Sequence, residues 1–399
     1  MAKKVYLISN YFHFASEKSS NRYRELAELI SKDKDISLEV ITSKFYQRTY
    51  QYRENIEELA KDIPFKATFV DERAYHKSIC VKRLLASRDF AKNVIKHLKS
   101  HPKPDLIYQV VPTIDVAEAV SRYAKKHKIP LIIDIQDLWP EAFKMAINIP
   151  IVSDILFAPY MIKANLTYGR ADAICAVSQT YVDRALSVNK KCTKTEAVYI
   201  GINLDVFDSN VKENNKEKNK NITIAYCGSL SKSYDIKLVI DALALMENPP
   251  KFLVMGGGND LEYLKQYSKE KEVDVTFTGF LPYSEMCAML SSCDITVNPI
   301  VGSSVASIIN KHGDYAASGL PVINTQDSEE YCALVEKYNM GFNCVGKGAA
   351  ELAKHIQILI SDEQLRITMG QNARRCSEEK FNRVNTYQRL YLLIKSFLG

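Results

Sequence analysis

The most informative segment of the chain is Ser303-Ser304-Val305-Ala306-Ser307-Ile308-Ile309-Asn310-Lys311-His312-Gly313-Asp314-Tyr315-Ala316-Ala317-Ser318-Gly319-Leu320-Pro321-Val322-Ile323. A polar loop leads into a short helix that carries one carboxylate, Asp314, and the pair Ser318-Gly319 ends that helix before an apolar strand begins at Pro321. The first N–H groups of a helix have no partner inside the helix, so a loop that enters a helix N-terminus can bind phosphate. The segment therefore predicts an α/β fold with an anion-binding junction.

Length and composition indicate a globular protein of two domains. The chain has 399 residues, of which 46% are apolar and 25% are charged. No apolar run approaches the roughly 18 to 20 residues that a membrane-spanning helix needs. Residues 1–8 carry the charges of a signal peptide but have a short apolar core, so we interpret them as the first strand of a cytoplasmic protein.

The cysteines and charges exclude several functional classes. Nine cysteines are scattered singly without a C-x-x-C pair, which predicts neither a disulfide framework nor a metal site. The net charge is +6, and no nucleic-acid reader motif is present, so we expect no nucleic-acid partner. Residues 77–103 concentrate basic side chains on a helical apolar pattern. This stretch is either a surface that docks on anionic lipid or a solvated helix.

Strands and helices alternate along the whole chain, which is typical of parallel, doubly wound sheets. The polar stretch 209–221 predicts a surface loop, and a second alternating series follows it from Ile222. We expect two facing Rossmann-like domains, residues 1–200 and 201–382, with a ligand-binding cleft between the carboxyl ends of their sheets.

Several motifs resemble family 4 retaining glycosyltransferases. Residues 314–323 resemble the family's E-A-M-A-x-G-x-P-V-I signature, and residues 137–141, Asp-Leu-Trp-Pro-Glu, resemble the branch that builds bacterial capsule and O-antigen polysaccharides. Further matches follow in order at 171–173, 201–207 and 319–321. The resemblance implies the GT-B fold, with residues 1–200 binding the acceptor, residues 201–382 binding the nucleotide sugar, and a final helix, 383–399, packing back on the first domain.

The loop at residues 228–235 is the predicted pyrophosphate site, because it joins a strand to a helix through glycine. The family carries G-R-L-x-x-x-K-G here, and alignment places Ser229 at the Arg and Tyr234 at the Lys. Both usual cations are therefore missing, and we expect Lys232 to supply the positive charge. The donor-binding residues predicted in this loop are Gly228, Ser229, Lys232 and Ser233.

Further donor contacts follow from the resemblance. Asp314 stands at the family's second Glu, which binds the ribose hydroxyls. The family's first acid, which contacts the donor sugar, falls on Ala306, which cannot act as a ligand. Lys311 is a candidate for the donor phosphate or sugar, with a solvated helix residue as the alternative. The remaining predicted donor-binding residues are Asn310 beside it, Gly257 in the turn Gly256-Gly257-Gly258, and Gly279, Phe280 and Leu281 in the G-x-x-P turn that holds the base through its backbone.

The acceptor site is expected around residues 136–141. Many family members carry His where this chain has Gln136, and in retaining GT-B enzymes the leaving phosphate is thought to take the acceptor's proton. The protein then positions the substrates and stabilises charge. The predicted catalytic residues are Asp137, Gln136 and Lys232, and the predicted acceptor-binding residues are Asn21, Arg22, Trp139 and Glu141. Alternatively, Glu141 caps a helix that starts at Pro140.

The sequence therefore predicts a metal-independent retaining glycosyltransferase without a cofactor. It would move a sugar from a nucleotide sugar, expected to be a UDP-sugar, to a lipid-linked glycan acceptor in bacterial surface polysaccharide synthesis. We expect a cytoplasmic protein that can dock on an anionic membrane surface. Two alternatives stay open: a nucleotide-sugar 2-epimerase, which shares the GT-B shape, and a non-catalytic GT-B binding protein, which the residues Ala306, Ser229, Tyr234 and Gln136 would suit.

Overall fold

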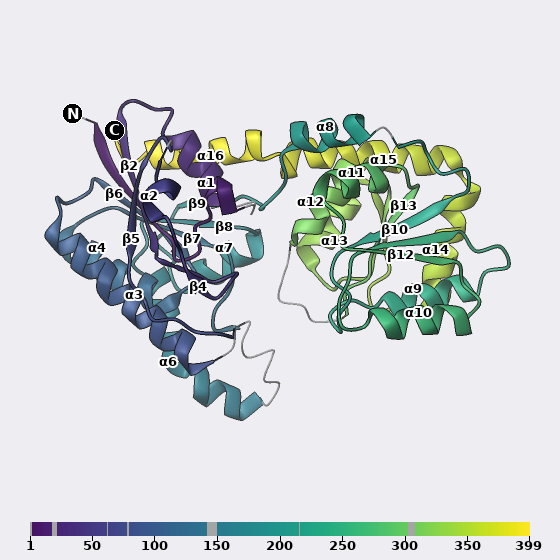
Figure 1. The fold of residues 1–399 in the computed structure, drawn as a ribbon, viewed down its shortest axis with the longest axis horizontal. Helices are drawn as coiled ribbons and strands as arrows, with labels where there is room; N and C mark the ends of the chain where they lie inside the picture. The colour runs from purple at the N-terminus through teal and green to yellow at the C-terminus, as the bar shows by residue number, and fades with distance from the viewer. Residues whose placement is uncertain are drawn as a thin grey trace. The chain divides into compact units, whose positions relative to one another are not determined.

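A computed structural model describes residues 2–17, 22–61, 63–77, 80–141, 150–214, 216–301 and 308–399. The chain divides into two compact units, Met1–Val198 with Tyr387–Gly399, and Tyr199–Thr386 (Figure 1). The sequence analysis places the corresponding boundaries at residues 200 and 383. Each unit is a parallel sheet with helices in its crossover connections, so both halves have the Rossmann-like architecture.

The N-terminal unit contains a seven-stranded sheet in the order β5-β2-β1-β6-β7-β8-β9, and all of its neighbouring strands are parallel. Its strands are β1 (Lys3–Ile8), β2 (Ile36–Ser43), β5 (Lys66–Val70), β6 (Leu106–Val111), β7 (Leu131–Ile135), β8 (Ala173–Ala176) and β9 (Lys194–Ala197), beside a small hairpin of β3 (Phe45–Tyr46) and β4 (Gln51–Tyr52). Its helices are η1 (Ala15–Glu17), α1 (Arg22–Ile30), α2 (Ile56–Leu59), α3 (Val81–Ser100), α4 (Ile114–His127), α6 (Pro150–Tyr168) and α7 (Gln179–Leu186).

The C-terminal unit contains a six-stranded parallel sheet in the order β12-β11-β10-β13-β14-β15. Its strands are β10 (Thr223–Cys227), β11 (Lys251–Met255), β12 (Val275–Gly279), β13 (Ile295–Asn298), β14 (Val322–Asn324) and β15 (Gly341–Asn343). Its helices are α8 (Leu204–Asn214), α9 (Ile236–Ala244), α10 (Leu261–Glu270), α11 (Tyr283–Ser291), α12 (Asn310–Ala317), α13 (Glu329–Tyr338), α14 (Ala349–Ser361), α15 (Glu363–Cys376) and η2 (Ser377–Phe381).

The last helix, α16 (Arg383–Lys395), begins in the C-terminal unit and ends in the N-terminal one. Tyr387, Leu390 and Ile394 from this helix are buried in the same apolar cluster as Val5 and Leu7 of β1. Burying an apolar side chain of this size stabilises a fold by roughly 1.5–3 kcal/mol. The end of the chain therefore forms part of the core of the N-terminal unit.

Each sheet has one switch point, where the strand order reverses and ligands of open α/β sheets bind. In the N-terminal unit it lies between β1 and β6, and in the C-terminal unit between β10 and β13. The loops that follow these four strands are therefore the places where binding residues are expected. The glycine loop after β10 is one of them.

The stretch 209–221 departs only in part from its sequence-based prediction, because residues 216–221 are exposed and lie outside helices and strands as expected. We expected a surface loop, but residues 209–214 form the end of α8. This helix buries Leu204 and Phe207, and the Asn214 side chain donates a hydrogen bond to the Ser284 carbonyl at 3.3 Å. Its polar residues are solvated on the other face, so a polar composition alone was a poor guide to a loop.

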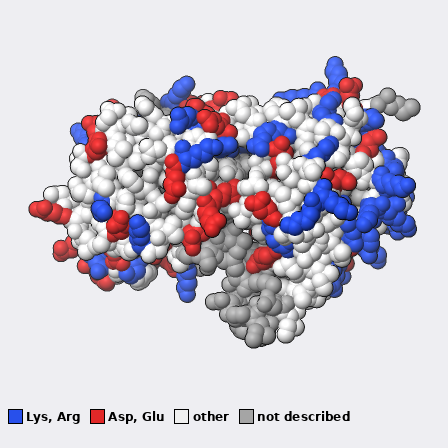
Figure 2. Space-filling view, turned by 180° about the vertical axis from the view of Figure 1, so that it is seen from behind, with Lys and Arg blue, Asp and Glu red and all other residues white. Residues whose placement is uncertain are grey.

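Two helices of the N-terminal unit, α3 and α6, expose basic and apolar side chains, respectively. In Figure 2 the blue side chains of this unit gather at the right of the view. The exposed basic residues of α3 are Lys82, Arg88, Lys92, Lys96 and Lys99. On α6, the exposed aliphatic residues are Ile155, Leu156, Ile162 and Leu166. Among the described residues, no helix combines the length and the apolar character needed to cross a bilayer.

Candidate functional site

Glycine loops from three adjacent strands meet at the carboxyl edge of the C-terminal sheet. Gly228 after β10 donates its N–H to the Met255 carbonyl at 2.8 Å, and Leu230 N donates to the Gly257 carbonyl at 2.9 Å. A Cβ on Gly256 would lie 1.8 Å from the Gly228 carbonyl oxygen. Only glycine allows this approach, and Gly256 also has a φ of 150°, which other residues rarely adopt. The two loops are therefore packed backbone against backbone, with Gly228 half-buried and Gly256 buried.

The residues predicted to bind phosphate lie on the loop before α9. Asp235 caps this helix by accepting a hydrogen bond from Leu238 N at 2.9 Å. Ser229, Lys232 and Ser233 are exposed on the same loop. They are accessible to a ligand at the strand edge, next to a helix N-terminus whose dipole favours an anion.

Lys311 reaches this loop from α12, on a separate part of the sequence. Its Nζ donates a hydrogen bond to the Tyr226 Oη at 2.7 Å and lies 3.4 Å from the ring centroid of Tyr234. A Cβ on Gly228 would lie 2.3 Å from Nζ, so the amine is directly against the glycine loop. Burial lowers the pKa of Lys311 to about 7. The alternative of a solvated helix residue does not fit these contacts.

Asp314 lies one turn further along α12. Its Oδ1 accepts a hydrogen bond from Tyr283 Oη at 2.9 Å, and burial raises the pKa of its carboxyl group to about 6. At neutral pH this carboxylate is mainly ionised and can accept hydrogen bonds from a vicinal diol. Asn310 is the first residue of α12, and its side chain is exposed.

An exposed aromatic side chain projects from the β12 edge. Phe280 is 75% exposed, and a Cβ on Gly257 would meet its ring at 3.0 Å, so the ring rests against that glycine. Gly279 before it has a φ of 74°, and Leu281 after it packs on an apolar cluster. The turn is thus anchored by Leu281 and presents one flat ring to solvent.

A ladder of asparagines, which the sequence analysis did not single out, supports the start of α12. Asn298, Asn324 and Asn343 end the neighbouring strands β13, β14 and β15 in register. The Asn298 amide donates to Asn324 Oδ1 at 2.9 Å and lies 3.2 Å from Nε2 of His312. His312 in turn stacks on Tyr331 at 3.4 Å between ring centroids. The repeated Asn at strand ends was the signal that could have revealed this ladder.

The structure corrects the interpretation of Arg22 as an acceptor-binding residue. Its guanidinium forms a buried ion pair with Asp134 at 3.0 Å and also donates to the Val198 carbonyl. Tyr108 Oη donates to the same carboxylate at 2.5 Å. Both charged side chains have no exposed area, so Arg22 holds α1 against the sheet of its unit instead of facing a ligand. Asn21, the other residue predicted there, lies outside the described residues.

The predicted catalytic and acceptor-binding residues after β7 form specific contacts within their own unit. Trp139 Nε1 donates to Asp137 Oδ2 at 3.0 Å, and burial raises the pKa of Asp137. Glu141 accepts a hydrogen bond from Arg184 Nε at 2.6 Å, which shows that its charge is paired inside the unit. Gln136 is half-buried at the strand end, where its N–H binds the Val111 carbonyl at 2.8 Å.

Arg83 also lies at this edge of the sheet, although the sequence alone identified it only as part of the basic stretch 77–103. Its guanidinium carbon lies 4.6 Å from the ring centroid of Trp139, and its Nη2 donates to Tyr11 Oη at 3.1 Å. One face of Trp139 is therefore covered by a cation, which limits its use as an open sugar platform.

Polar groups that sequence reasoning missed line the switch point of the N-terminal sheet. Thr113 Oγ1 donates to Asn10 Oδ1 at 3.2 Å, and Asn10 Nδ2 donates to Glu72 Oε2 at 3.4 Å. Burial raises the pKa of Glu72 to about 7. These residues follow β1, β5 and β6, so only the sheet order brings them together.

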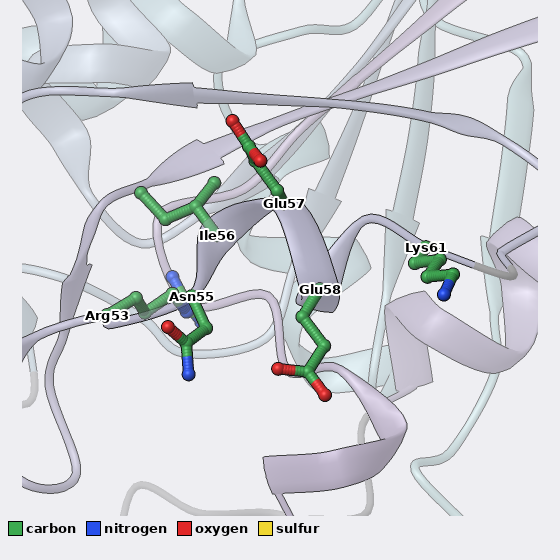
Figure 3. Close-up of a pocket in the computed structure, with 6 residues that line it drawn as sticks. All are labelled: Arg53, Asn55, Ile56, Glu57, Glu58 and Lys61. Atoms are coloured by element: carbon green, nitrogen blue, oxygen red, sulfur yellow. The ribbon is translucent and has the colours of Figure 1, made fainter.

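The hollow in Figure 3 belongs to the N-terminal unit. It is lined by Arg53, Asn55, Ile56, Glu57, Glu58 and Lys61, from α2 and its flanking residues. Arg53 is already paired with Glu17 at 2.7 Å and donates to the Phe12 carbonyl. In the described part of the chain, no group of three or more His, Cys, Asp or Glu side chains could hold a metal ion. We assign no site to this hollow.

Comparison with known proteins identifies the half that carries the glycine loops. Residues 207–376 match the family model described as glycosyl transferases group 1. The matched residues include all three glycine loops together with Lys311 and Asp314. The chain matches none of the curated proteins with which it was compared.

Solved structures with the same fold cover both units. HepE from Anabaena, solved with UDP, is 16% identical over 99% of this chain and 100% of its own, with a TM-score of 0.66. Sucrose-phosphate synthase from Thermosynechococcus elongatus is 16% identical over 99% of both chains, with a TM-score of 0.69. WaaG, a glycosyltransferase involved in lipopolysaccharide biosynthesis, is 15% identical over 98% of this chain and 99% of its own, with a TM-score of 0.64. The expected GT-B fold of two Rossmann-like domains is confirmed.

Proposed function

We propose that this protein is a retaining, metal-independent family 4 glycosyltransferase that transfers a sugar from a UDP-sugar to a lipid-linked glycan acceptor in bacterial surface polysaccharide synthesis, of capsule or O-antigen type. The observation that carries the proposal is the meeting of three glycine loops with Lys311 and Asp314 inside the residues that match the group 1 model. HepE has been solved with UDP and with UDP-glucose, which supports the choice of donor.

The donor would lie along the carboxyl edge of the C-terminal sheet. Backbone N–H groups near Gly228 and the exposed Ser229, Lys232 and Ser233 suit its diphosphate. The Asp314 carboxylate suits the ribose diol. The exposed ring of Phe280 suits one face of the base, with Gly257, Gly279 and Leu281 shaping the turn beneath it and Asn310 near the sugar.

The acceptor would bind at the carboxyl edge of the N-terminal sheet, where β7 lies beside β6. Asp137 and Gln136 follow β7 and remain the candidates for orienting the acceptor hydroxyl, with Trp139 beside them. Glu141 contributes indirectly, because its ion pair with Arg184 fixes the same segment. The leaving phosphate would take the acceptor's proton, so the side chains supply position and charge stabilisation and no nucleophile is required.

A lipid-linked acceptor requires access to a membrane. The exposed side chains of α3 and α6 suit contact with a membrane surface. Five exposed basic side chains of α3 occur in the same unit as four exposed aliphatic side chains of α6. Each basic residue near an anionic bilayer contributes about 1 kcal/mol of attraction, and the aliphatic groups add burial. We propose a cytoplasmic protein that docks on the inner face of the cell membrane through this surface.

Flotation with liposomes tests the docking directly. The wild type should float with vesicles that contain anionic lipid and lose this binding as salt is raised. A variant with Lys92, Lys96 and Lys99 changed to Gln should bind less, whereas a control with Lys265→Gln in the C-terminal unit should bind as the wild type does. Equal binding of all three proteins, or none to anionic vesicles, would reject the docking surface.

Ligand-detected NMR with UDP-, GDP- and ADP-sugars tests the proposed reaction. Binding of a UDP-sugar, with sugar transfer only after a lipid-linked glycan is added, is the expected result. Conversion of the free nucleotide sugar to its 2-epimer would favour the epimerase. Absence of binding to every nucleotide sugar would favour a non-catalytic binding protein.

A further inference from the structure

The amine of Lys311 occupies an unusual environment for a charged group. It is enclosed by the rings of Tyr226 and Tyr234, with its Nζ 4.3 and 3.4 Å from the two ring centroids. Among the residues that the structure describes, no carboxylate forms an ion pair with it. The Tyr226 hydroxyl group, which accepts the Lys311 hydrogen bond, donates its own to the Ser229 carbonyl at 2.6 Å. The amine is therefore connected to the glycine loop through neutral groups.

The position of Lys311 bears on the two cations that the loop at residues 228–235 lacks. The resemblance to family 4 places a Ser and a Tyr, Ser229 and Tyr234, where an Arg and a Lys are usual. In the structure, the Tyr234 ring supports the amine of Lys311 at that same loop. A cation is thus present beside Gly228, although it comes from α12 and not from the loop itself.

We propose that Lys311 is the principal cation for the donor diphosphate and that diphosphate binding is coupled to uptake of one proton by its amine. The inference rests on the proposed function and adds to it where the positive charge comes from and when it forms. No covalent bond changes: the neutral amine accepts a proton from solvent, and the resulting ammonium pairs with the phosphate.

The charged groups around Lys311 make this coupling possible. Burial is the largest influence and lowers its pKa to about 7, while Cys227 on β10 acts in the opposite direction. Burial raises the pKa of the Cys227 thiol to about 12, so this group stays neutral near pH 7. Tyr226 and Tyr234 have raised pKa values and stay neutral as well. On α12 itself, Asp314 lies one turn away and is bonded to Tyr283.

The direction in which diphosphate affinity changes with pH follows from these groups. A bound phosphate favours the ammonium form and raises the pKa of Lys311. Above pH 7 the free protein holds less of that form, so each further pH unit should weaken diphosphate binding by about tenfold until the bound-state pKa is reached. The terminal phosphate of UDP has a pKa of about 6, as phosphate monoesters do, so it does not titrate in this range.

Calorimetry of UDP binding in buffers of different ionisation enthalpy measures the proton directly. At pH 8 we expect uptake of close to one proton and, between pH 7 and 8.5, a fall in affinity of about tenfold or more. GDP and ADP titrated in parallel should show the same uptake if they bind. UDP binding with no proton uptake and a flat pH profile would overturn the inference.

Two substitutions and one control complete the test. Lys311→Met should weaken UDP binding at least tenfold and abolish the proton uptake, while Lys311→Arg should restore binding with a flat pH profile, because guanidinium stays charged. Lys265→Met is the control and should change neither; Lys265 is a half-exposed lysine on α10. Failure of the wild type to bind any nucleoside diphosphate would instead refute the proposed function itself. Circular dichroism and thermal melting confirm that each variant is folded.

Discussion

The contact proposed between Asp314 and the ribose gives a sharp prediction, because both the side chain and the ligand can be changed. In Asp314→Asn the side chain keeps its shape and can still accept the Tyr283 hydrogen bond, which is 2.9 Å long in the wild type. It loses its charge and one of its two acceptor oxygens. Hydrogen bonds to charged groups contribute about 1.5–3 kcal/mol each, so UDP should bind about 10- to 150-fold more weakly.

The assay is calorimetric titration of the wild type and the variant with UDP and with 2′-deoxy-UDP. The wild type should prefer UDP by about tenfold or more, and Asp314→Asn should bind both ligands with nearly equal affinity. The wild-type preference should also shrink as the pH falls below about 6, because the carboxyl group, whose pKa is raised to about 6, then becomes protonated. A variant that binds UDP normally, or that still prefers it over the deoxy ligand, would refute the assignment of this carboxylate to the ribose.

Three further predictions concern the framework of the two units. Gly256→Ala should lower the melting temperature and abolish UDP binding, because its Cβ would lie 1.8 Å from the Gly228 carbonyl oxygen; calorimetric melting and titration measure both. Arg22→Met should destabilise the protein by about 3–5 kcal/mol in urea unfolding, since it leaves the Asp134 charge buried without its partner; an unchanged unfolding midpoint would contradict the buried ion pair. Burial raises the pKa of Glu72 to about 7, so its contribution to the free energy of unfolding is present below pH 4.5 and is lost as the pH rises toward 7 and above. Glu72→Gln should therefore remove up to about 3 kcal/mol of the pH dependence of stability, measured by urea unfolding between pH 4.5 and 8.

Local patterns in the sequence predicted the elements that depend on neighbouring residues. The glycine loop at 228–235 and the helix at Asp314 each lie within one strand-loop-helix segment, where turn and capping residues are close in the sequence. The alternation of strands and helices likewise predicted the two parallel sheets. These features need no knowledge of distant contacts.

Features that depend on distant contacts could not be predicted in the same way. Arg22 was interpreted as a ligand contact because its loop stands where family 4 has a Gly-rich loop. Its partner Asp134 lies 112 residues away, and only the folded sheet brings the two charges together. The cage around Lys311 joins it to Tyr226, 85 residues away. The helical end of α8 at 209–214 depends on packing that its polar composition does not reveal.

A crystal structure of the protein with bound UDP tests the central claim most directly. The account predicts the diphosphate at the Gly228 loop with Lys311 Nζ in hydrogen-bond distance of a phosphate oxygen, and the ribose hydroxyls at the Asp314 carboxylate. UDP bound at a different edge of the sheet, or with neither side chain in contact, would contradict it.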